Sequence, residues 1–570
     1  MNKTISISIF LLFVVPAMVI SQEVLFSPND WQDPSIFEKG QTAPHAFHVS
    51  FDTESAALKN DPSESKNYHL LNGEWDFKWV ATVDKVPEGF WLPSFNTIEW
   101  DKIKVPSNWQ MEGYGHAKFR NISLSFESDP PHIPSYYNPV GCYRKPFDIP
   151  EIWEGKNIKL RFEGVKSASY IWINGKRVGY NQGGFEPAEF DISSFVTTGK
   201  NILAVQVIRF SDGSYLENQD MWRLSGIFRD VKLYAQPKTM IRDHYVVTDL
   251  DGAYENATLS LSTIIGNLED TARKIQLEID VFDDNNNSIL GRKAKSGLLN
   301  VHPNASEKID ITVQVQHPKK WSAEMPNRYT LLVNLKDNDG NLLESFSEKI
   351  GFREVEYMNN ILTVNGIPIK LNGINSHMHH PEKGQAVPIA TLRKDLEIMK
   401  RFNLNCVRTC HYPPTPEYLD LADELGIYVV DEVGDEAHAN IQLSENPKWT
   451  EMYKDRSRKL VYRDRNHPSV IIWSAGNESG SGENIKAVIE TGKEIDPSRP
   501  AWMYGGNTFY IPFEDIVGPR YYIPLGLRHV VKGDMLPKGD DRSSFMDEYL
   551  AATGNSLGGL DEYWEVIRRS

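Results

Sequence analysis

The segment Asn466-His-Pro-Ser-Val-Ile-Ile-Trp-Ser-Ala-Gly-Asn-Glu-Ser-Gly480 carries the clearest signal for the fold. Its apolar centre, Val470 to Trp473, predicts a buried strand, and the polar pair Asn477-Glu478 follows where that strand ends. A buried strand that delivers polar side chains at its carboxyl end is typical of parallel α/β proteins. We therefore expect parallel strands on both sides of this segment.

The sequence around this segment alternates between strand and helix from Arg353 onward. Leu392, Leu396, Met399 and Phe402 mark one face of a helix, and a second helix begins after Thr415 and ends at Gly426. Strands are predicted at 371–375, 405–408, 427–430, 470–473, 501–503, 516–518 and 543–547. This order predicts a (β/α)8 TIM barrel over 353–570 that contains seven of its eight strands.

The residues before the barrel predict only strands. Ile158, Leu160 and Phe162 alternate with polar residues, and Asn174-Gly175 lies where a type I′ hairpin turn is expected. We predict a β-sandwich over 22–237. The stretch 238–352 has the length and the alternation of an immunoglobulin-like β-sandwich. The predicted fold class is thus multidomain β plus α/β, with an incomplete barrel last.

The composition of the chain argues against several classes of protein. The chain has 570 residues, 61 basic and 77 acidic, for a net charge of −16. An acidic chain without a long basic run is a poor nucleic-acid partner. Its 3 cysteines form neither a disulfide framework nor a zinc pattern. The aromatic content of 11% suits sugar binding, and it also suits a chain rich in β structure.

The first 21 residues have the features of a secretory signal peptide. Lys3 gives a positive start, the run from Ile7 to Ile20 is apolar except for Ser8, and Ser21 is small enough to precede a cleavage site. The run is shorter than the roughly 20 residues that a membrane span needs. Residue 22 is glutamine rather than a lipid-bearing cysteine. We expect export to the periplasm or the extracellular space, without a membrane anchor.

Polar residues follow five of the predicted barrel strands, where a barrel carries its reactive groups. They are Asn375 to His380, Arg408 to Tyr412, Asp431 to His438, Asn477-Glu478 and Asp547-Glu548. Glu478 and Glu548 are candidates for the two carboxylates of a retaining glycosidase, which lie about 5–5.5 Å apart. A zinc site built from His377 to His380 is disfavoured because no HExxH motif is present. A cysteine nucleophile at Cys406 or Cys410 is disfavoured because both are predicted to be buried in a strand.

Several longer stretches then resemble glycoside hydrolases of family 2, on the β-galactosidase branch. They are Asn72 to Phe77, Val105 to Tyr114, Ser211-Asp-Gly-Ser-Tyr-Leu-Glu-Asn-Gln-Asp-Met-Trp-Arg-Leu-Ser-Gly-Ile-Phe-Arg-Asp230 and the barrel segment Asn466 to Gly480. The resemblance extends from about Trp31 to Trp564. It implies a jelly-roll-like, sugar-binding β-sandwich over 22–237 and an enzyme that removes terminal β-D-galactosyl residues from oligosaccharides or polysaccharides by double displacement.

The resemblance also implies a role for each matching residue. Glu478 matches the acid/base and Glu548 the nucleophile. Glu436, His438 and Glu478 match the ligands of Mg²⁺, and Asp212 matches a ligand of Na⁺ that also reaches the sugar. The remaining substrate contacts that the resemblance implies are Asn121, Asp212, His377, His411 and Asn477. A divalent cation beside the acid/base would tune the pKa of that carboxyl group.

The chain departs from the family pattern in three places. Ala551 stands where the galactosidases have a sugar-binding histidine, and Met503 stands where they have a tyrosine that contacts the nucleophile, with Tyr504 one residue later. The chain also ends at Ser570, before the eighth strand and before further sodium ligands. The first two departures argue against simple galactosides such as lactose and leave a decorated or polysaccharide-derived galactoside as an alternative. The early end of the chain leaves three further hypotheses: a fragment, a split gene product or a degenerate member.

Two alternative functions stay open at this point. One is a β-glucuronidase or β-mannosidase of the same family, against which the long stretch Ser211 to Asp230 argues. The other is a non-catalytic carbohydrate-binding remnant, which the early end of the chain suggests. The expected partner in each case is a glycan, most simply a β-galactoside derived from an oligosaccharide or a polysaccharide. The sequence leaves the oligomeric state open.

Overall fold

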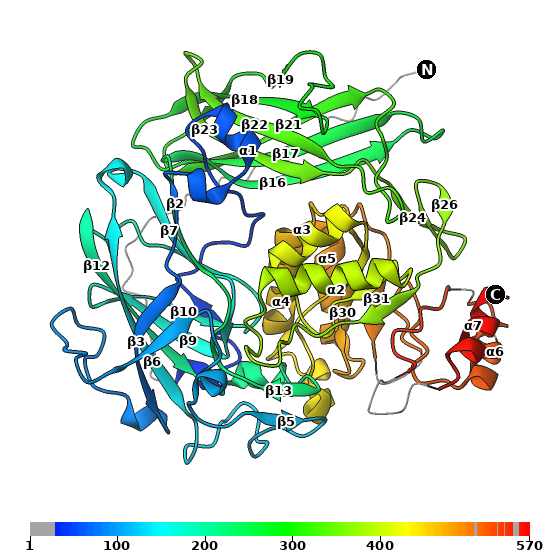
Figure 1. The fold of residues 1–570 in the computed structure, drawn as a ribbon, viewed down its shortest axis with the longest axis horizontal. Coiled ribbons are helices and arrows are strands. Elements are labelled where there is room, and N and C mark those ends of the chain that lie inside the picture. Colours follow the sequence, from blue (N-terminus) through cyan, green and yellow to red (C-terminus); the bar gives the residue numbers. More distant parts are fainter. Residues whose placement is uncertain (1–28, 507–509, 533, 541, 551–557, 570) are drawn as a thin grey trace, which may run out of the picture.

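The structure is a computed structural model that describes residues 29–506, 510–532, 534–540, 542–550 and 558–569. The predicted signal peptide, residues 1–21, lies outside this range, as does Ala551. Figure 1 shows three bodies: a sandwich in blue to cyan, a second sandwich in green, and an α/β body in yellow to red. Among the described residues, no helix has both the length and the apolar character needed to cross a membrane.

The first sandwich consists of two large antiparallel sheets that face each other across one core. The strand order is β1-β10-β9-β12-β6-β3-β4 in one sheet and β11-β7-β15-β2 in the other. The strands are β1 (Glu38–Lys39), β2 (Tyr68–Leu70), β3 (Gly73–Val80), β4 (Asp101–Val105), β6 (Val140–Ile149), β7 (Asn157–Phe162), β9 (Ala168–Ile173), β10 (Lys176–Gln182), β11 (Ala188–Asp191), β12 (Gly199–Ile208) and β15 (Val231–Gln236).

The predicted hairpin turn is confirmed. β9 pairs with β10 directly across Asn174-Gly175, with Ile173 opposite Lys176. Asn174 has a φ of 51° and Gly175 a φ of 83°, the two positive values that a type I′ turn requires. Two short strand pairs extend from this sandwich: β5 (Lys118–Arg120) with β13 (Met221–Arg223), and β8 (Val165–Lys166) with β14 (Gly226–Ile227).

The second sandwich has a three-stranded sheet β16-β17-β21 and a five-stranded sheet around β18 and β22. Its apolar alternation fills one core between the two sheets, as the sequence predicts. The strands are β16 (Thr239–Leu250), β17 (Ala257–Asn267), β18 (Arg273–Phe282), β19 (Ala294–Lys295), β20 (Leu299–Val301), β21 (Ala305–Val315), β22 (Tyr329–Asp337) and β23 (Leu342–Ile350).

An early segment of the chain packs on this second sandwich. Helix α1 (Glu54–Lys59) lies against β22 and β23, and Phe51 forms an isolated bridge with Ser345. Val49, Phe51, Ala57 and Leu332 share a small buried cluster. A part of the stretch that the sequence assigns to the first sandwich thus joins the two sandwiches.

The barrel region has five parallel strands in the order β27-β28-β29-β30-β31. A small antiparallel sheet of β24 (Val355–Met358), β25 (Ile361–Val364) and β26 (Ile367–Pro368) precedes them. The five strands are β27 (Gly373–Asn375), β28 (Cys406–Arg408), β29 (Tyr428–Glu432), β30 (Val470–Asn477) and β31 (Trp502–Gly505). The helices are α2 (Ile389–Arg401), α3 (Pro416–Leu425), α4 (Thr450–Asp464), α5 (Glu483–Ile495), α6 (Pro524–Val531) and α7 (Leu560–Arg568).

The two later strands of the prediction take another form. Where the sequence predicts strands at 516–518 and 543–547, the described residues have only a parallel bridge between Val517 and Ser544. Pro519 lacks the N–H that would continue a ladder, which is one physical reason for the interruption. The backbone still runs beside the sheet there, since Phe545 N donates to Val517 O at 2.9 Å.

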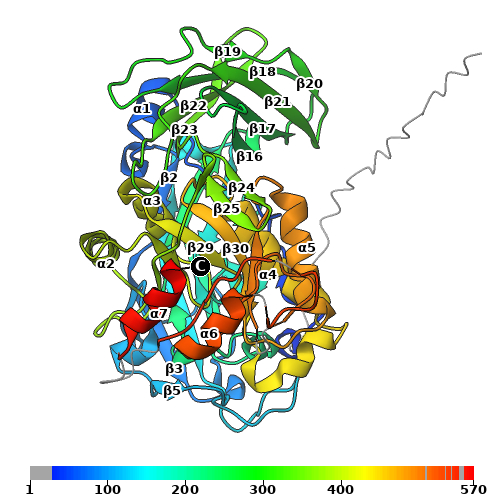
Figure 2. The ribbon, with the colours of Figure 1, turned by 90° about the vertical axis from the view of Figure 1, so that its right-hand side faces the viewer.

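The last two helices pack on each other. Leu527 and Val530 of α6 share a small core with Tyr563 and Val566 of α7. Figure 2 shows this helix pair in orange and red in front of β29 and β30.

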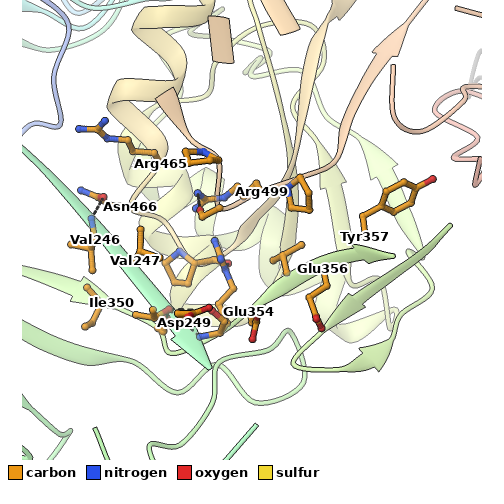
Figure 3. Close-up of a pocket in the computed structure, with 18 of the residues that line it drawn as sticks. Val246, Val247, Asp249, Ile350, Glu354, Glu356, Tyr357, Arg465, Asn466 and Arg499 are labelled. Carbon is orange, nitrogen blue, oxygen red and sulfur yellow. Dashed lines mark hydrogen bonds between the residues drawn. The ribbon is translucent and has the colours of Figure 1, made fainter. Parts of the chain in front are cut away.

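A pocket of about 380 Å³ lies where the second sandwich meets the barrel (Figure 3). It is lined by β16 residues such as Val247, by Glu354 and Tyr357, and by Arg465 and Arg499. Arg499 and the neighbouring Pro500 precede β31, so this pocket lies at the amino-terminal ends of the barrel strands. TIM barrels carry their active sites at the carboxyl-terminal ends of the strands. We therefore interpret this pocket as a feature of the packing between the two domains.

Candidate active site

The carboxyl ends of the barrel strands bring most of the predicted residues together. Arg408 ends β28, Glu432 ends β29 and Asn477 ends β30. Arg408 donates to Glu432 at 2.6 Å, to Asn477 Oδ1 at 2.9 Å and to Glu548 Oε1 at 3.0 Å. A single buried guanidinium therefore links three strand ends to Glu548.

Glu548 lies among donors and cations. Its Oε1 contacts Arg408 at 3.0 Å and Arg520 Nη2 at 3.1 Å, and it lies 3.7 Å from His411 Nε2. The Tyr521 hydroxyl donates to its other oxygen. Burial alone would raise the pKa of the Glu548 carboxyl, but Arg408 and Arg520 outweigh it and lower that pKa to about 2. Glu548 is therefore ionised at neutral pH, as a carboxylate nucleophile must be.

Glu478 lies in a more acidic environment. Its Oε1 lies 3.0 Å from Arg520 Nη1 and its Oε2 lies 3.1 Å from His438 Nδ1. Burial raises the pKa of Glu478, and the nearby carboxylates of Glu436 and Glu548 add to this, while Arg520 and His438 oppose it. A raised pKa favours the protonated form that a general acid needs.

The backbone at Glu478 is also unusual. Its φ is +40°, a left-handed value that a non-glycine residue rarely adopts. Its N–H donates to Gly505 O of β31 at 2.7 Å, which holds the turn in place. Backbone conformations of this kind cluster at functional sites, where the surrounding structure maintains them.

A second cluster beside Glu478 has the character of a metal site. Asp220, Glu436 and His438 each place one ligand atom within 4.8 Å of the others. Both oxygens of Glu436, Asp220 Oδ1 and His438 Nδ1 are buried and make no hydrogen bond within the described residues. Buried carboxylate oxygens without partners are costly, and a hard cation such as Mg²⁺ would satisfy them. Glu436 and His438 fit the predicted set, and Asp220 is an additional candidate that the sequence prediction missed.

The first sandwich reaches this cluster through its backbone. Glu217 forms a parallel bridge with Glu436, Asn218 N donates to Glu436 O at 2.8 Å, and Glu436 N donates to Leu216 O at 2.6 Å. The segment 216–218 therefore fixes both Glu436 and the following Asp220. This contact explains how a sandwich residue can take part in a barrel site.

Two predicted contacts of the first sandwich lie apart from these carboxylates. Asp212 is fully buried, accepts from Gln182 Nε2 at 2.5 Å and has a pKa raised by burial to about 7. Its Oδ2 has no hydrogen-bond partner within the described residues. Asn121 is exposed on the chain that follows β5. Within the described residues, neither Asp212 nor Asn121 forms a hydrogen bond or an ion pair with Glu478 or Glu548.

Both predicted histidines line the Glu548 side. His411 Nδ1 lies 2.8 Å from Glu432 Oε1, and the rings of His411 and His377 meet edge to face with centroids 5.4 Å apart. Burial, reinforced by His411, lowers the pKa of His377 well below its usual value. His377 is therefore neutral at pH 7. With Cys410 the two histidines form a close group of potential ligands.

The tyrosine that the resemblance places near strand five has a substitute from elsewhere in the chain. Met503 is buried in the barrel core, and Tyr504 accepts from Ser479 N at 2.6 Å without contacting Glu548. Tyr521 contacts Glu548 instead. Sequence reasoning missed both Arg520 and Tyr521. They come after Pro519, beyond the predicted strand 516–518, and the end of that short strand is the sequence signal that points to them.

Comparison with known families identifies the class of protein. The models named "Glycosyl hydrolases family 2, sugar binding domain", "Glycosyl hydrolases family 2" and "Glycosyl hydrolases family 2, TIM barrel domain" match residues 68–237, 239–353 and 355–570 in turn. The chain therefore belongs to glycosyl hydrolase family 2 and has its sandwich and TIM barrel architecture.

Individual relatives sharpen this result. The chain is 39% identical over 567 residues to a beta-galactosidase of Pseudoalteromonas haloplanktis, covering 96% of this chain and 53% of that protein. It thus spans about half the length of the curated relatives it matches. A family 2 member from Bacteroides cellulosilyticus has a similar structure, with a TM-score of 0.71, 23% identity and coverage of 88% of this chain and 65% of the other.

A beta-glucuronidase of Bifidobacterium dentium shares the fold as well. The TM-score is 0.70 at 20% identity, with 89% of each chain covered. At this identity the likeness concerns the fold alone. The curated sequence relatives at 39% identity are named beta-galactosidases.

Proposed function

We propose that the chain carries the catalytic centre of a retaining β-galactosidase that acts on terminal β-galactosyl residues of oligosaccharides or polysaccharides. The observation that supports this most is the contrast between two carboxyl groups that both contact Arg520: the pKa of Glu548 is lowered to about 2, and the pKa of Glu478 is raised. Groups whose pKa values diverge in this way are suited to opposite roles.

The first chemical step uses both groups at once. The ionised Glu548 attacks the anomeric carbon, the glycosidic C–O bond breaks, and Glu478 donates its proton to the departing oxygen. Arg408, Arg520 and Tyr521 hold Glu548 in place by the contacts described above. In the second step Glu478 takes a proton from water, and that water releases the sugar from Glu548.

Other residues position the sugar and the acid. With its Oδ1 held by Arg408 and Arg520, Asn477 is oriented to donate from Nδ2 to a sugar hydroxyl. His377 and His411 border the same space. Asp220, Glu436, His438 and Glu478 would hold Mg²⁺, which when bound stabilises negative charge and orients Glu478. Asp212 and Asn121 are kept as sugar contacts on the resemblance alone, and Asp212 as a ligand of Na⁺.

Export is part of the proposal. The segment Met1 to Ser21 supports transport to the periplasm or the extracellular space, where a glycan substrate would be met. Mass spectrometry of the protein from a native host tests this: an N-terminus near Gln22 agrees with export, and an intact Met1 contradicts it.

Hydrolysis assays on residues 22–570 test the function. Aryl β-galactoside, β-glucuronide and β-mannoside are compared, with Glu548→Gln as the matched control. We expect release from the galactoside only, and a loss on the order of 10⁵-fold in Glu548→Gln. If the enzyme prefers the glucuronide or the mannoside, that sugar takes the place of galactose in the proposal. Binding of galactose without turnover, unchanged in Glu548→Gln, would favour a non-catalytic carbohydrate-binding protein.

A further inference from the structure

Two exposed aromatic rings face each other on the small sheet of β5 and β13, which Figure 1 shows beside the lower part of the barrel. Phe119 is paired with Trp222 in register, and their ring centroids are 5.9 Å apart at an interplanar angle of 71°. Phe119 is 55% exposed and Trp222 is 47% exposed. Two large rings in contact form a small contiguous apolar patch, and exposed apolar patches with a polar rim are a feature of ligand-binding surfaces.

The strand that carries Trp222 is firmly anchored. Met221 and Arg223, its neighbours on both sides, are buried. Arg223 donates to Asn218 Oδ1 at 2.7 Å and to Gln219 O, and Met221 belongs to the core shared with the barrel. Trp222 is therefore presented by a fixed strand, which suits a preorganised binding surface.

The ring pair lies on the Glu478 side of the site. Trp222 is two residues beyond Asp220, which limits the distance between their Cα atoms to about 7 Å. His438 Nδ1 lies 3.9 Å from Asp220 Oδ1 and 3.1 Å from Glu478 Oε2. Glu478 is the residue that protonates the leaving oxygen. The part of the substrate beyond that oxygen therefore extends from this side.

We propose that Phe119 and Trp222 form a subsite that binds the pyranose ring on the leaving-group side of the bond to be cleaved. The proposal rests on the function proposed above and names the substrate class more closely: a β-galactoside whose leaving group is itself a sugar. A pyranose presents C–H groups on its face, which pack against aromatic rings and remove apolar surface of both partners from water. The two strands give the rings a fixed geometry for this contact.

Kinetics with two leaving groups tests the subsite. The probes are lactose, whose leaving group is a glucose ring, and β-galactosyl fluoride, whose leaving group has no ring. In Trp222→Ala and Phe119→Ala we expect the ratio of the two kcat/KM values, lactose over fluoride, to fall about tenfold or more. Trp222→Phe keeps a ring and should restore most of the ratio. Phe402→Ala, at an exposed ring beyond α2, is the matched control and should leave the ratio unchanged.

An equal loss on both probes, or no loss, would overturn the subsite. Calorimetry on Glu548→Gln separates this outcome from a failure of the proposed function, because it needs no turnover. If lactose binds this variant more tightly than galactose does, and Trp222→Ala removes the difference, the subsite stands even if the wild type hydrolyses neither probe. If lactose has no advantage over galactose, the subsite is overturned while the hydrolysis is unaffected.

Discussion

The surroundings of Glu548 and those of Glu478, here called the two sides of the site, differ in charge and in the domains from which their residues come. The Glu548 side is lined by cations and donors from the barrel alone: Arg408, His411, Arg520 and Tyr521. The Glu478 side gathers acidic groups, and one of them, Asp220, comes from the first sandwich. Both carboxyl groups are buried to a similar degree, so burial cannot assign their roles. Burial raises the pKa of both groups, and the charges around them decide the difference. At Glu548 the cations Arg408 and Arg520 outweigh burial and favour an ionised nucleophile. At Glu478 the cations Arg520 and His438 do not outweigh burial, to which the carboxylates of Glu436 and Glu548 add, so the protonated acid is favoured.

The acid role of Glu478 gives the largest expected effect. In Glu478→Gln, kcat on lactose should fall about 10²–10⁴-fold, since the departing sugar oxygen needs a proton. On a dinitrophenyl galactoside, whose leaving group departs unprotonated, formation of the glycosyl-enzyme should be affected far less. Pre-steady-state release of dinitrophenol measures this directly. Equal losses for both leaving groups would contradict the assignment and remove the contrast between the two sides.

Arg520 touches both sides, so its removal tests whether they are separate. In Arg520→Met the pKa values of Glu478 and Glu548 should both rise, because the same cation lowers each of them. Glu548 must be ionised and Glu478 protonated in the free enzyme. Both limbs of the pH profile of kcat/KM should therefore move to higher pH, measured at fixed saturating Mg²⁺, with a loss of about 10²-fold near neutrality.

Folding must be checked for this variant. Arg520 also pairs with Asp547 at 2.6 Å, and without Arg520 the buried Asp547 would keep Arg408, at 3.8 Å, as an ion-pair partner. Removing one partner of a buried ion pair destabilises a protein by up to about 3–5 kcal/mol. Arg520→Lys keeps the charge and serves as the control in thermal unfolding. A shift of one limb only would mean that the guanidinium acts on a single carboxyl group.

Tyr521 contacts Glu548 and not Glu478, so its substitution should lower activity less than that of Arg520 and should change the pKa of Glu548 alone. Tyr521→Phe removes a hydrogen bond to a charged group, a loss of about 1.5–3 kcal/mol, or roughly tenfold to a hundredfold in kcat/KM. Without this donor the pKa of Glu548 rises, so only the acid limb should move to higher pH. Tyr504→Phe is the matched control, since its hydroxyl contacts Ser479 N instead. A shift of the alkaline limb would show that Tyr521 also acts on Glu478.

The sequence predicts the regular parts of this site and misses those that depend on irregular backbone. Asn477 and Glu478 follow the long apolar strand β30, and reading that strand was enough to place them at its end. Arg520 and Tyr521 follow a segment interrupted by Pro519, where strand periodicity carries little information. They act in the site because the chain there runs parallel to 543–545 through a single bridge.

Asp220 was missed for a different reason. It lies within the long stretch that led to the family, but its position beside Glu436 depends on contacts between backbone atoms of two domains. No pattern of side chains along one domain encodes such a contact. The hairpin at Asn174-Gly175 is the opposite case, since two adjacent residues determine it and it was predicted in full.

The smallest expected effect concerns the metal on the Glu478 side. Glu436→Gln removes one charge from a set of unpartnered oxygens, and we expect Mg²⁺ to bind this variant at least about tenfold more weakly. Activity at saturating Mg²⁺ should then fall only a few-fold, because Glu478 remains present. Titration calorimetry with MgCl₂ on chelator-treated protein measures the affinity, and Asp220→Asn tests whether the residue of the sandwich contributes as a ligand.

Asp423→Asn is the matched control, since Asp423 forms an acidic group with His467 away from the site. If Mg²⁺ binding is unchanged in Glu436→Gln, the unpartnered oxygens have another explanation. The acidity of this side would then act on Glu478 directly rather than through an ion. A bound cation would lower the pKa of Glu478, so the two cases predict different behaviour of the alkaline limb when Mg²⁺ is removed. With a bound ion, removal moves that limb to higher pH; without one, the limb stays where it is.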